Sequence, residues 1–158
     1  MNKGGLMNIR DAVENLHREH DEEARLLGAF ESALELAVTG DDEKRSLGLS
    51  ELREIVKQSA RIRGSSAHDS EALDSPAFLL VDGSERARLK DTLFHLERAS
   101  YEFRKELAFA TTFSTEELVG QGRRLAASIR EQIAYEEELL REVEAELSGN
   151  SAGLRSRE

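Results

Sequence analysis

Four stretches of the chain carry apolar residues at every third or fourth position, the spacing that places them along one face of an α-helix. In the first stretch, residues 9–38, this stripe comprises Ile9, Val13, Leu16, Leu27, Phe30 and Leu34. In the last stretch, residues 117–147, it comprises Leu118, Leu125, Ile129, Leu140, Val143 and Leu147. Both stretches are therefore predicted to be long amphipathic helices.

Two shorter amphipathic helices are predicted between them. The second helix has Leu52, Ile55, Ser59 and Ile62 on one face, and its pattern is lost at residues 64–66. The third begins near residues 82–84 and carries Leu89, Leu93, Leu96, Phe103 and Leu107. Between these two helices, the irregular segment 64–83 contains the apolar run 78–81, which we expect to pack over one end of the helices.

Capping residues separate the helices. Gly40 ends the first helix, and Asp41 and Asp42 follow it as candidates to cap the second. Ser114 and Glu117 have the spacing of a capping box, which opens the last helix. The connections between the first two helices and between the last two are therefore predicted to be short.

Four amphipathic helices with short connections predict an all-α fold, an up-down-up-down four-helix bundle. We expect residues 9–147 to form this bundle as one domain, because 158 residues are about the size of one. Residues 1–8 and 148–158 show no apolar periodicity. They are predicted to be a flexible N-terminus and a disordered C-terminal tail.

Polar residues interrupt two of the apolar stripes. Glu136 lies at the centre of the last stripe and His20 at the centre of the first, while Gln132 and Glu23 lie near the same centre lines. Burying an ionisable group without a partner costs several kcal/mol. We therefore expect His20 and Glu136 to meet each other, a third polar group or a metal ion inside the bundle.

The composition limits which partners and cofactors fit. The formal net charge of −10 argues against nucleic acid and anionic membrane surfaces, which would repel the chain. Without cysteine, any metal ion must be held by His, Asp and Glu. No apolar run approaches the length of a membrane span and the N-terminus lacks a signal-peptide core, so a cytoplasmic location is expected.

Segments near both ends resemble the hemerythrin-like, or His-His-Glu cation-binding, family. The run from Leu16 to Glu23, followed by Leu26 and Leu27, is similar to that family's first helix. The run from Gln132 to Leu140 is similar to its last helix, where a His-x-x-x-Glu pair precedes a leucine-rich finish. Residues 66–76 and 88–91 fall where the family has its second-helix His-x-x-x-Glu run and the start of its third helix.

The resemblance implies a bundle that holds non-haem iron for dioxygen binding, sensing, or redox and nitric-oxide chemistry. His20 and Glu136 stand at family ligand positions. Four other ligand positions depart from the family pattern and are occupied here by Gln132, Ser66, Ser70 and Leu93. A depleted site of this kind predicts one metal ion, or two, held by His20, Glu136, Gln132 and Glu23, or else a metal-free protein.

Several alternatives remain open for these side chains. The alternative to metal ligation for His20 and Glu136 is a buried hydrogen-bonded pair without metal. His68 and Glu71 would join the site only if the second helix shifted its register, whereas His95 points away from its stripe. His17 either shares an ion with His20, three residues away, or lies at the bundle edge, hydrogen-bonded to a neighbouring helix.

The function expected from these features is a metal- or small-ligand-binding sensor or regulatory protein, with a metal ion or a small diatomic molecule as ligand. The alternative is a metal-free interaction module, a homodimer or a scaffold for a protein partner, that docks through the end of the second helix or residues 78–81. Enzymatic turnover would need a complete iron site, and the missing ligands argue against it.

Overall fold

The structure, a computed structural model, describes residues 2–59, 75–112 and 115–156, with side chains for those within 8–149. In these ranges the chain forms four α-helices, one short 3-10 helix and no β-strand, which confirms the predicted all-α fold. The elements are α1 (Asn2–Val38), α2 (Asp42–Gln58), η1 (Pro76–Phe78), α5 (Gly83–Ala108) and α6 (Glu116–Ser156).

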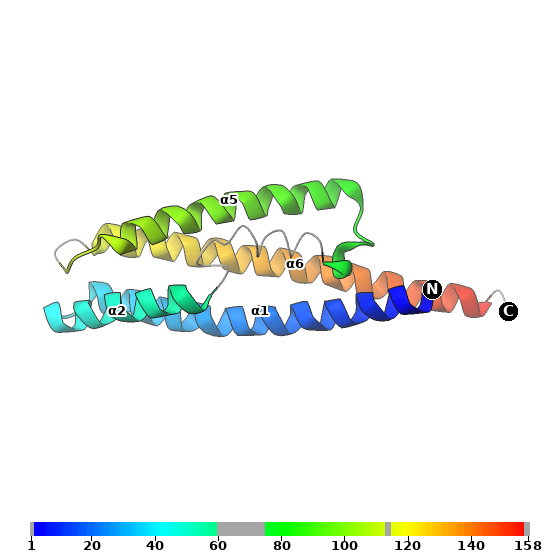
Figure 1. Ribbon diagram of the computed structural model, residues 1–158, viewed down its shortest axis with the longest axis horizontal. Coiled ribbons are helices and arrows are strands. Elements are labelled where there is room, and N and C mark those ends of the chain that lie inside the picture. The colour runs from blue at the N-terminus through cyan, green and yellow to red at the C-terminus, as the bar shows by residue number, and fades with distance from the viewer. Residues whose placement is uncertain (1, 60–74, 113–114, 157–158) are drawn as a thin grey trace.

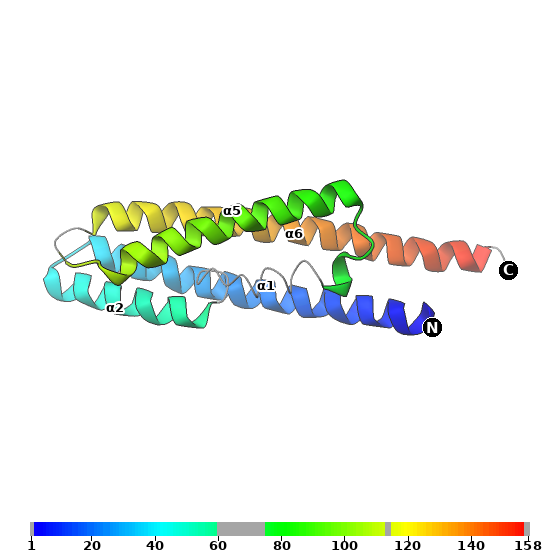
Figure 2. The same ribbon diagram turned by 45° about the horizontal axis from the view of Figure 1, so that its top comes forward.

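The helices alternate in direction along the bundle (Figure 1). Helix α1 packs against α2 and α6, and α5 packs against α6 and, less extensively, against α2. Both views place the two ends of the chain at the same end of the bundle (Figure 2). The predicted up-down-up-down four-helix bundle is thus the observed architecture.

Capping residues set three of the helix boundaries, two of them at the predicted residues Gly40 and Asp41. Gly40 has a φ of +89°, a left-handed conformation that favours glycine and ends α1. Asp41 then accepts a hydrogen bond from the Lys44 backbone N–H at 3.0 Å, and Asp82 accepts one from the Glu85 backbone N–H at 2.9 Å. Both bonds satisfy N–H groups that the first turn of a helix leaves unpaired.

Four other boundaries differ from the prediction or cannot be compared with it. Helix α1 extends back to Asn2 and α6 extends to Ser156, so helix continues into both segments that we expected to be flexible or disordered. Their flexibility stays a prediction. Helix α2 ends at Gln58, because its C-cap residue Ser59 is extended, so it stops before the predicted end near residues 64–66. Residues 64–66 themselves and the Ser114 capping residue lie outside the described residues.

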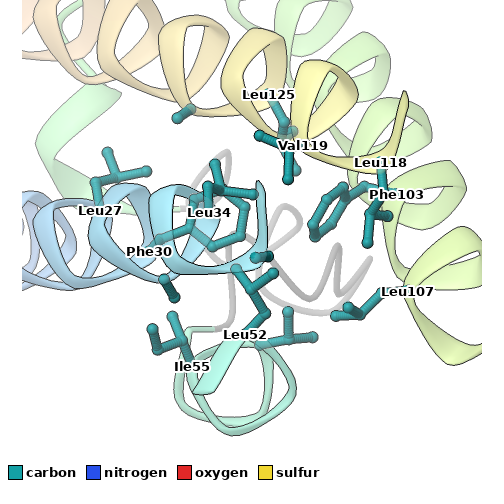
Figure 3. Close-up of a cluster of buried hydrophobic side chains, with 14 of the residues drawn as sticks. Leu27, Phe30, Leu34, Leu52, Ile55, Phe103, Leu107, Leu118, Val119 and Leu125 are labelled. Atoms are coloured by element: carbon teal, nitrogen blue, oxygen red, sulfur yellow. The ribbon is translucent and has the colours of Figure 1, made fainter. Parts of the chain in front are cut away.

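Two apolar clusters fill the bundle. The first joins the C-terminal half of α1 to α2, the C-terminal half of α5 and the N-terminal half of α6 (Figure 3). The second joins the N-terminal half of α1 to η1, the N-terminal half of α5 and the C-terminal half of α6. Phe78 is fully buried in the second cluster, so the run 78–81 packs against one end of the bundle through this ring, as expected.

A polar layer separates these two clusters. On α1 the second cluster reaches Leu16 and the first cluster begins at Leu27. The polar layer lies between these two residues and contains His20. On α6 it contains Gln132 and Glu136. The two inward-facing polar positions predicted from helical phase therefore lie at the same level of the bundle.

A close backbone contact joins α1 to α2. A Cβ atom added to Gly48 would lie 2.5 Å from the backbone N of Ala37 and 2.8 Å from the carbonyl O of Ala33. Only glycine fits at this position without moving one of the helices. In the described part of the chain, no helix is long and apolar enough to cross a membrane.

Candidate functional site

His20, Glu136 and Gln132 form a buried hydrogen-bonded group between α1 and α6. His20 Nε2 lies 2.9 Å from Glu136 Oε1, and Gln132 Nε2 donates to Glu136 Oε2 at 2.9 Å. Their exposed fractions are 2%, 0% and 6% respectively. Three of the four predicted site residues are therefore brought together, and each carboxylate oxygen of Glu136 accepts a hydrogen bond.

The fourth predicted residue, Glu23, faces another partner. Its Oε2 accepts a hydrogen bond from Ser59 Oγ at 2.8 Å. Ser59 is the C-cap residue of α2 and is fully buried. This bond ties the middle of α1 to the end of α2 and uses one of the oxygens that we expected to face an ion.

The buried group continues towards the surface through His17 and Glu137. His20 Nδ1 lies 3.4 Å from Glu137 Oε1, and His17 Nδ1 lies 2.5 Å from Glu137 Oε2. The other nitrogen of His17, Nε2, lies 2.6 Å from Oε1 of Glu144, whose side chain is 51% exposed. A chain of alternating carboxylates and imidazoles thus runs from exposed Glu144 to fully buried Glu136.

These contacts resolve the two alternatives for His17 in part. His17 lies at the bundle edge and is bonded to the neighbouring helix α6, as one alternative predicted. It also faces the same carboxylate as His20, which leaves the shared-ion alternative as a hypothesis. Burial tends to lower the pKa of His17, but the hydrogen bonds and negative charges of Glu144 and Glu137 outweigh it, and the pKa is raised above 6.5.

Within this series of side chains from Glu144 to Glu136, two buried atoms have no hydrogen-bond partner. They are Nδ1 of His20 and Oε2 of Glu137. Each still has a neighbour that can carry the opposite charge: His20 Nδ1 lies 3.4 Å from Glu137 Oε1, and Glu137 Oε2 lies 2.5 Å from His17 Nδ1. A buried polar atom left in this state costs about 1–3 kcal/mol. The outer side of His20 is therefore the least satisfied part of the polar layer.

Two surface pockets lie beside this buried group, one near His17 and Glu144 and the other near Gln132. One, of about 200 Å³, is lined by residues of α1 and α6 that include His17, Glu144 and Arg10. The other, of about 320 Å³, lies between α5 and α6 and is lined by Gln132 and Tyr135 among others. Burial and a hydrogen bond to Glu85 raise the pKa of Tyr135 to about 12, so its phenol remains protonated at neutral pH.

The remaining histidines lie away from this layer or cannot be placed. His95 is 69% exposed and lies 3.5 Å from Asp91 on its own helix, in keeping with the expectation that it points away from the core. His68 and Glu71 fall outside the described residues.

The described side chains do not fit a di-iron centre. Leu93, at a family histidine position, is buried in the second apolar cluster, and Ser66 and Ser70 lie outside the described residues. Both oxygens of Glu136 already accept hydrogen bonds from the protein. Within the described residues, no group of three or more His, Asp or Glu side chains is already gathered as a metal site.

Glu137 and Glu144 are the site residues that sequence reasoning missed. Neither carboxylate lies on the centre line of the apolar stripe of residues 117–147, so the helical pattern alone does not point to them. The available signal was a pair of spacings: His17 and His20 are three residues apart on α1, and Glu137 and Glu144 are seven apart on the antiparallel α6. Both spacings place their members on one helix face, where opposite charges can meet.

Searches against protein-family models, curated proteins and solved structures gave no match. The similarity to hemerythrin-like proteins therefore rests on the residues quoted for it and stays a prediction.

Proposed function

We propose that this protein is a cytoplasmic, hemerythrin-like sensor or regulatory protein that binds a divalent transition-metal ion at a reduced site built around His20. The observation that carries the proposal is the buried imidazole of His20, which has Nε2 fixed by Glu136 and Nδ1 without a hydrogen-bond partner. Imidazole is a good ligand for iron, zinc and copper ions, and a bound ion would satisfy this nitrogen.

The position of Glu136 supports a ligand role for His20. A histidine that binds a metal usually donates its other ring N–H to a carboxylate, which fixes the ring and raises its basicity. Glu136 is placed to do this for His20, and Gln132 in turn donates to Glu136. In this proposal Glu136 and Gln132 orient the ligand, a different role from the direct ligation that the family pattern implies.

The sensing step would be a shift in the population of the tightly packed bundle. The polar layer joins α1 to α6 between the two apolar clusters, so an ion held there would bind the packed state in preference to a loosened one. Because the chain offers few ligands, some coordination positions would be left for water or a small diatomic molecule.

Thermal unfolding with ferrous iron under anaerobic conditions tests this function. Chelator-treated protein should show a melting temperature that rises with iron concentration, because binding to the native state alone stabilises it by about 2.7 kcal/mol at 100 times Kd. His20→Gln should lose this rise, whereas His95→Gln, which changes an exposed histidine of α5, should keep it. The same rise in His20→Gln would contradict the proposal.

A second candidate function is a metal-free interaction module. It is favoured by large apolar side chains that are more than half exposed, among them Phe94 and Tyr101, which lie seven residues apart on α5, and Phe109 just beyond that helix. The run 78–81 supports it less well, because Phe78 is fully buried and only Leu79 is prominently exposed. Sedimentation of the metal-free protein tests the homodimer form of this candidate, since a monomer at every concentration would contradict it.

A further inference from the structure

Two imidazole rings present the same nitrogen to one carboxylate. Nδ1 of His17 lies 2.5 Å and Nδ1 of His20 lies 3.4 Å from the two oxygens of Glu137. The Nε2 atoms of the two rings contact separate carboxylates. His17 Nε2 lies 2.6 Å from Glu144 Oε1, and His20 Nε2 lies 2.9 Å from Glu136 Oε1. Each ring is thus held from behind by one carboxylate while both turn their second nitrogen towards Glu137.

Two neutral imidazole rings held in this way have no proton left to donate to Glu137. If each neutral ring carries its proton on Nε2 and donates it to Glu136 or Glu144, each Nδ1 has only a lone pair to offer. A lone pair that faces a carboxylate oxygen at these distances is repelled unless a cation lies between them. His20 Nδ1, which has no hydrogen-bond partner, shows this deficit most clearly.

We propose that a divalent transition-metal ion binds between Nδ1 of His17, Nδ1 of His20 and the carboxylate of Glu137, with Glu136 and Glu144 orienting the two rings. This inference rests on the proposed function and adds the location and the ligands of the ion. It places the ion on the outer side of His20, away from the interior position between His20 and Glu136 that the family pattern implies. Two histidines and one carboxylate are the ligands of many non-haem iron sites, and they also suit zinc and cobalt.

The distances need only a small adjustment. With metal–ligand bonds of about 2.1 Å, two atoms bound to the same ion lie about 3.0–3.4 Å apart. The separation of His20 Nδ1 and Glu137 Oε1, 3.4 Å, already falls in this range. The 2.5 Å contact between His17 and Glu137 must open, and His17 can turn because it is 35% exposed at the bundle edge. Among the described residues no ready-made group of three ligands is present, so the site needs this adjustment before it can hold an ion.

Charge and access also favour a cation at this place. Three carboxylates, those of Glu136, Glu137 and Glu144, surround two imidazoles that are neutral when they bind metal, so the site carries an excess of negative charge. The pocket of about 200 Å³ lined by His17 and Glu144 opens beside it and gives an ion a path from solvent. Water can fill the remaining coordination positions from this side.

Nitrogen-15 NMR of the histidine rings with zinc as the probe tests the site directly, because zinc is diamagnetic and shifts the nitrogen to which it binds. On addition of one equivalent of Zn²⁺ to the chelator-treated full chain, we expect the Nδ1 resonances of His17 and His20 to move while their Nε2 atoms stay protonated. His95 should be unchanged. A zinc-dependent shift of Nε2 in His20 would overturn the inference and leave the proposed function standing.

Variants at neighbouring positions provide matched controls in zinc titration calorimetry. His17→Gln and Glu137→Gln should each lower zinc affinity by more than 100-fold, since each loses a ligand, whereas Glu138→Gln changes an exposed neighbour and should bind like the parent. Glu136→Gln should retain one ion per chain with affinity about 10- to 100-fold lower, the effect of altering a group that orients a ligand. Circular dichroism of each variant checks that the bundle still folds.

The possible outcomes separate this inference from the proposed function. Zinc affinity that survives His17→Gln and Glu137→Gln but is lost in His20→Gln overturns the inference alone. Failure of the unmodified protein to bind zinc or ferrous iron overturns both, and a proton would then be the cation between the rings and Glu137.

Discussion

Glu136 on α6 and His20 on α1 meet across the interior of the bundle, with 2.9 Å between Oε1 and Nε2 and at most 2% of either side chain exposed. The pair lies in a polar layer that divides the apolar interior into two clusters. A buried pair of this kind is hard to replace one member at a time, because the group that remains is left uncompensated.

Replacing His20 alone by leucine should therefore destabilise the fold by about 3–5 kcal/mol, because the Glu136 carboxylate loses its buried partner. The double variant His20→Leu with Glu136→Leu should recover most of this loss, since two apolar side chains would join the two clusters into one. Urea unfolding followed by circular dichroism measures both. Equal stability of the single and double variants would mean that the two side chains do not interact.

Glycine-to-alanine changes at two helical positions should have opposite signs. Gly48→Ala places a Cβ 2.5 Å from the backbone of Ala37 and should cost about 1–3 kcal/mol, more than the roughly 1 kcal/mol gained in helix propensity. Gly28→Ala has no atom within 4 Å of the new Cβ and should stabilise α1 by about 0.5–1 kcal/mol. Thermal unfolding of both variants checks the α1–α2 contact, and stabilisation by Gly48→Ala would contradict it.

Phe78 and Leu79 are adjacent in sequence but differ in burial, 0% against 58% exposed. Phe78→Ala should cost about 3–5 kcal/mol of unfolding free energy because its ring fills the second cluster. Leu79→Ala should change it by less than about 0.5 kcal/mol. Similar losses at the two positions in denaturant unfolding would mean that the run 78–81 packs differently from the structure.

The stability of the metal-free protein should fall as pH rises across the neutral range because of His17. Its pKa is raised above 6.5 in the folded state, with the acceptors Glu144 and Glu137 outweighing the effect of burial. The stabilisation is fully present below pH 6.5 and is lost as pH rises through the raised folded value. Unfolding midpoints measured with chelator across this range should flatten in His17→Gln, and an unchanged pH dependence would count against the contacts of His17.

Helical phase was enough to predict the inner part of the site. Apolar spacing identifies the centre line of each helix, and a polar residue on that line must point inward wherever the helix packs. For this reason His20, Gln132 and Glu136 were predicted to face the interior, and all three are buried there.

The outer part of the site depends on how α1 and α6 are aligned along the bundle axis. The apolar pattern of a single helix shows which face points inward, but it does not determine this alignment. Glu137 lies at the edge of the α6 stripe, where a carboxylate faces solvent unless a basic group of the neighbouring helix is level with it. The structure brings His17 and His20 level with it. Glu23 shows the opposite error: it faces inward, but the end of α2 places Ser59 beside it.

The central claim is that the polar layer holds a metal ion, and metal content tests it most directly. Elemental analysis should be made on protein purified without chelator, before and after anaerobic reconstitution with ferrous iron, alongside the His20→Gln variant. We predict one ion per chain after reconstitution and none in the variant. A folded protein that retains no metal under either condition would contradict the claim and leave the polar layer as a hydrogen-bonded structural element.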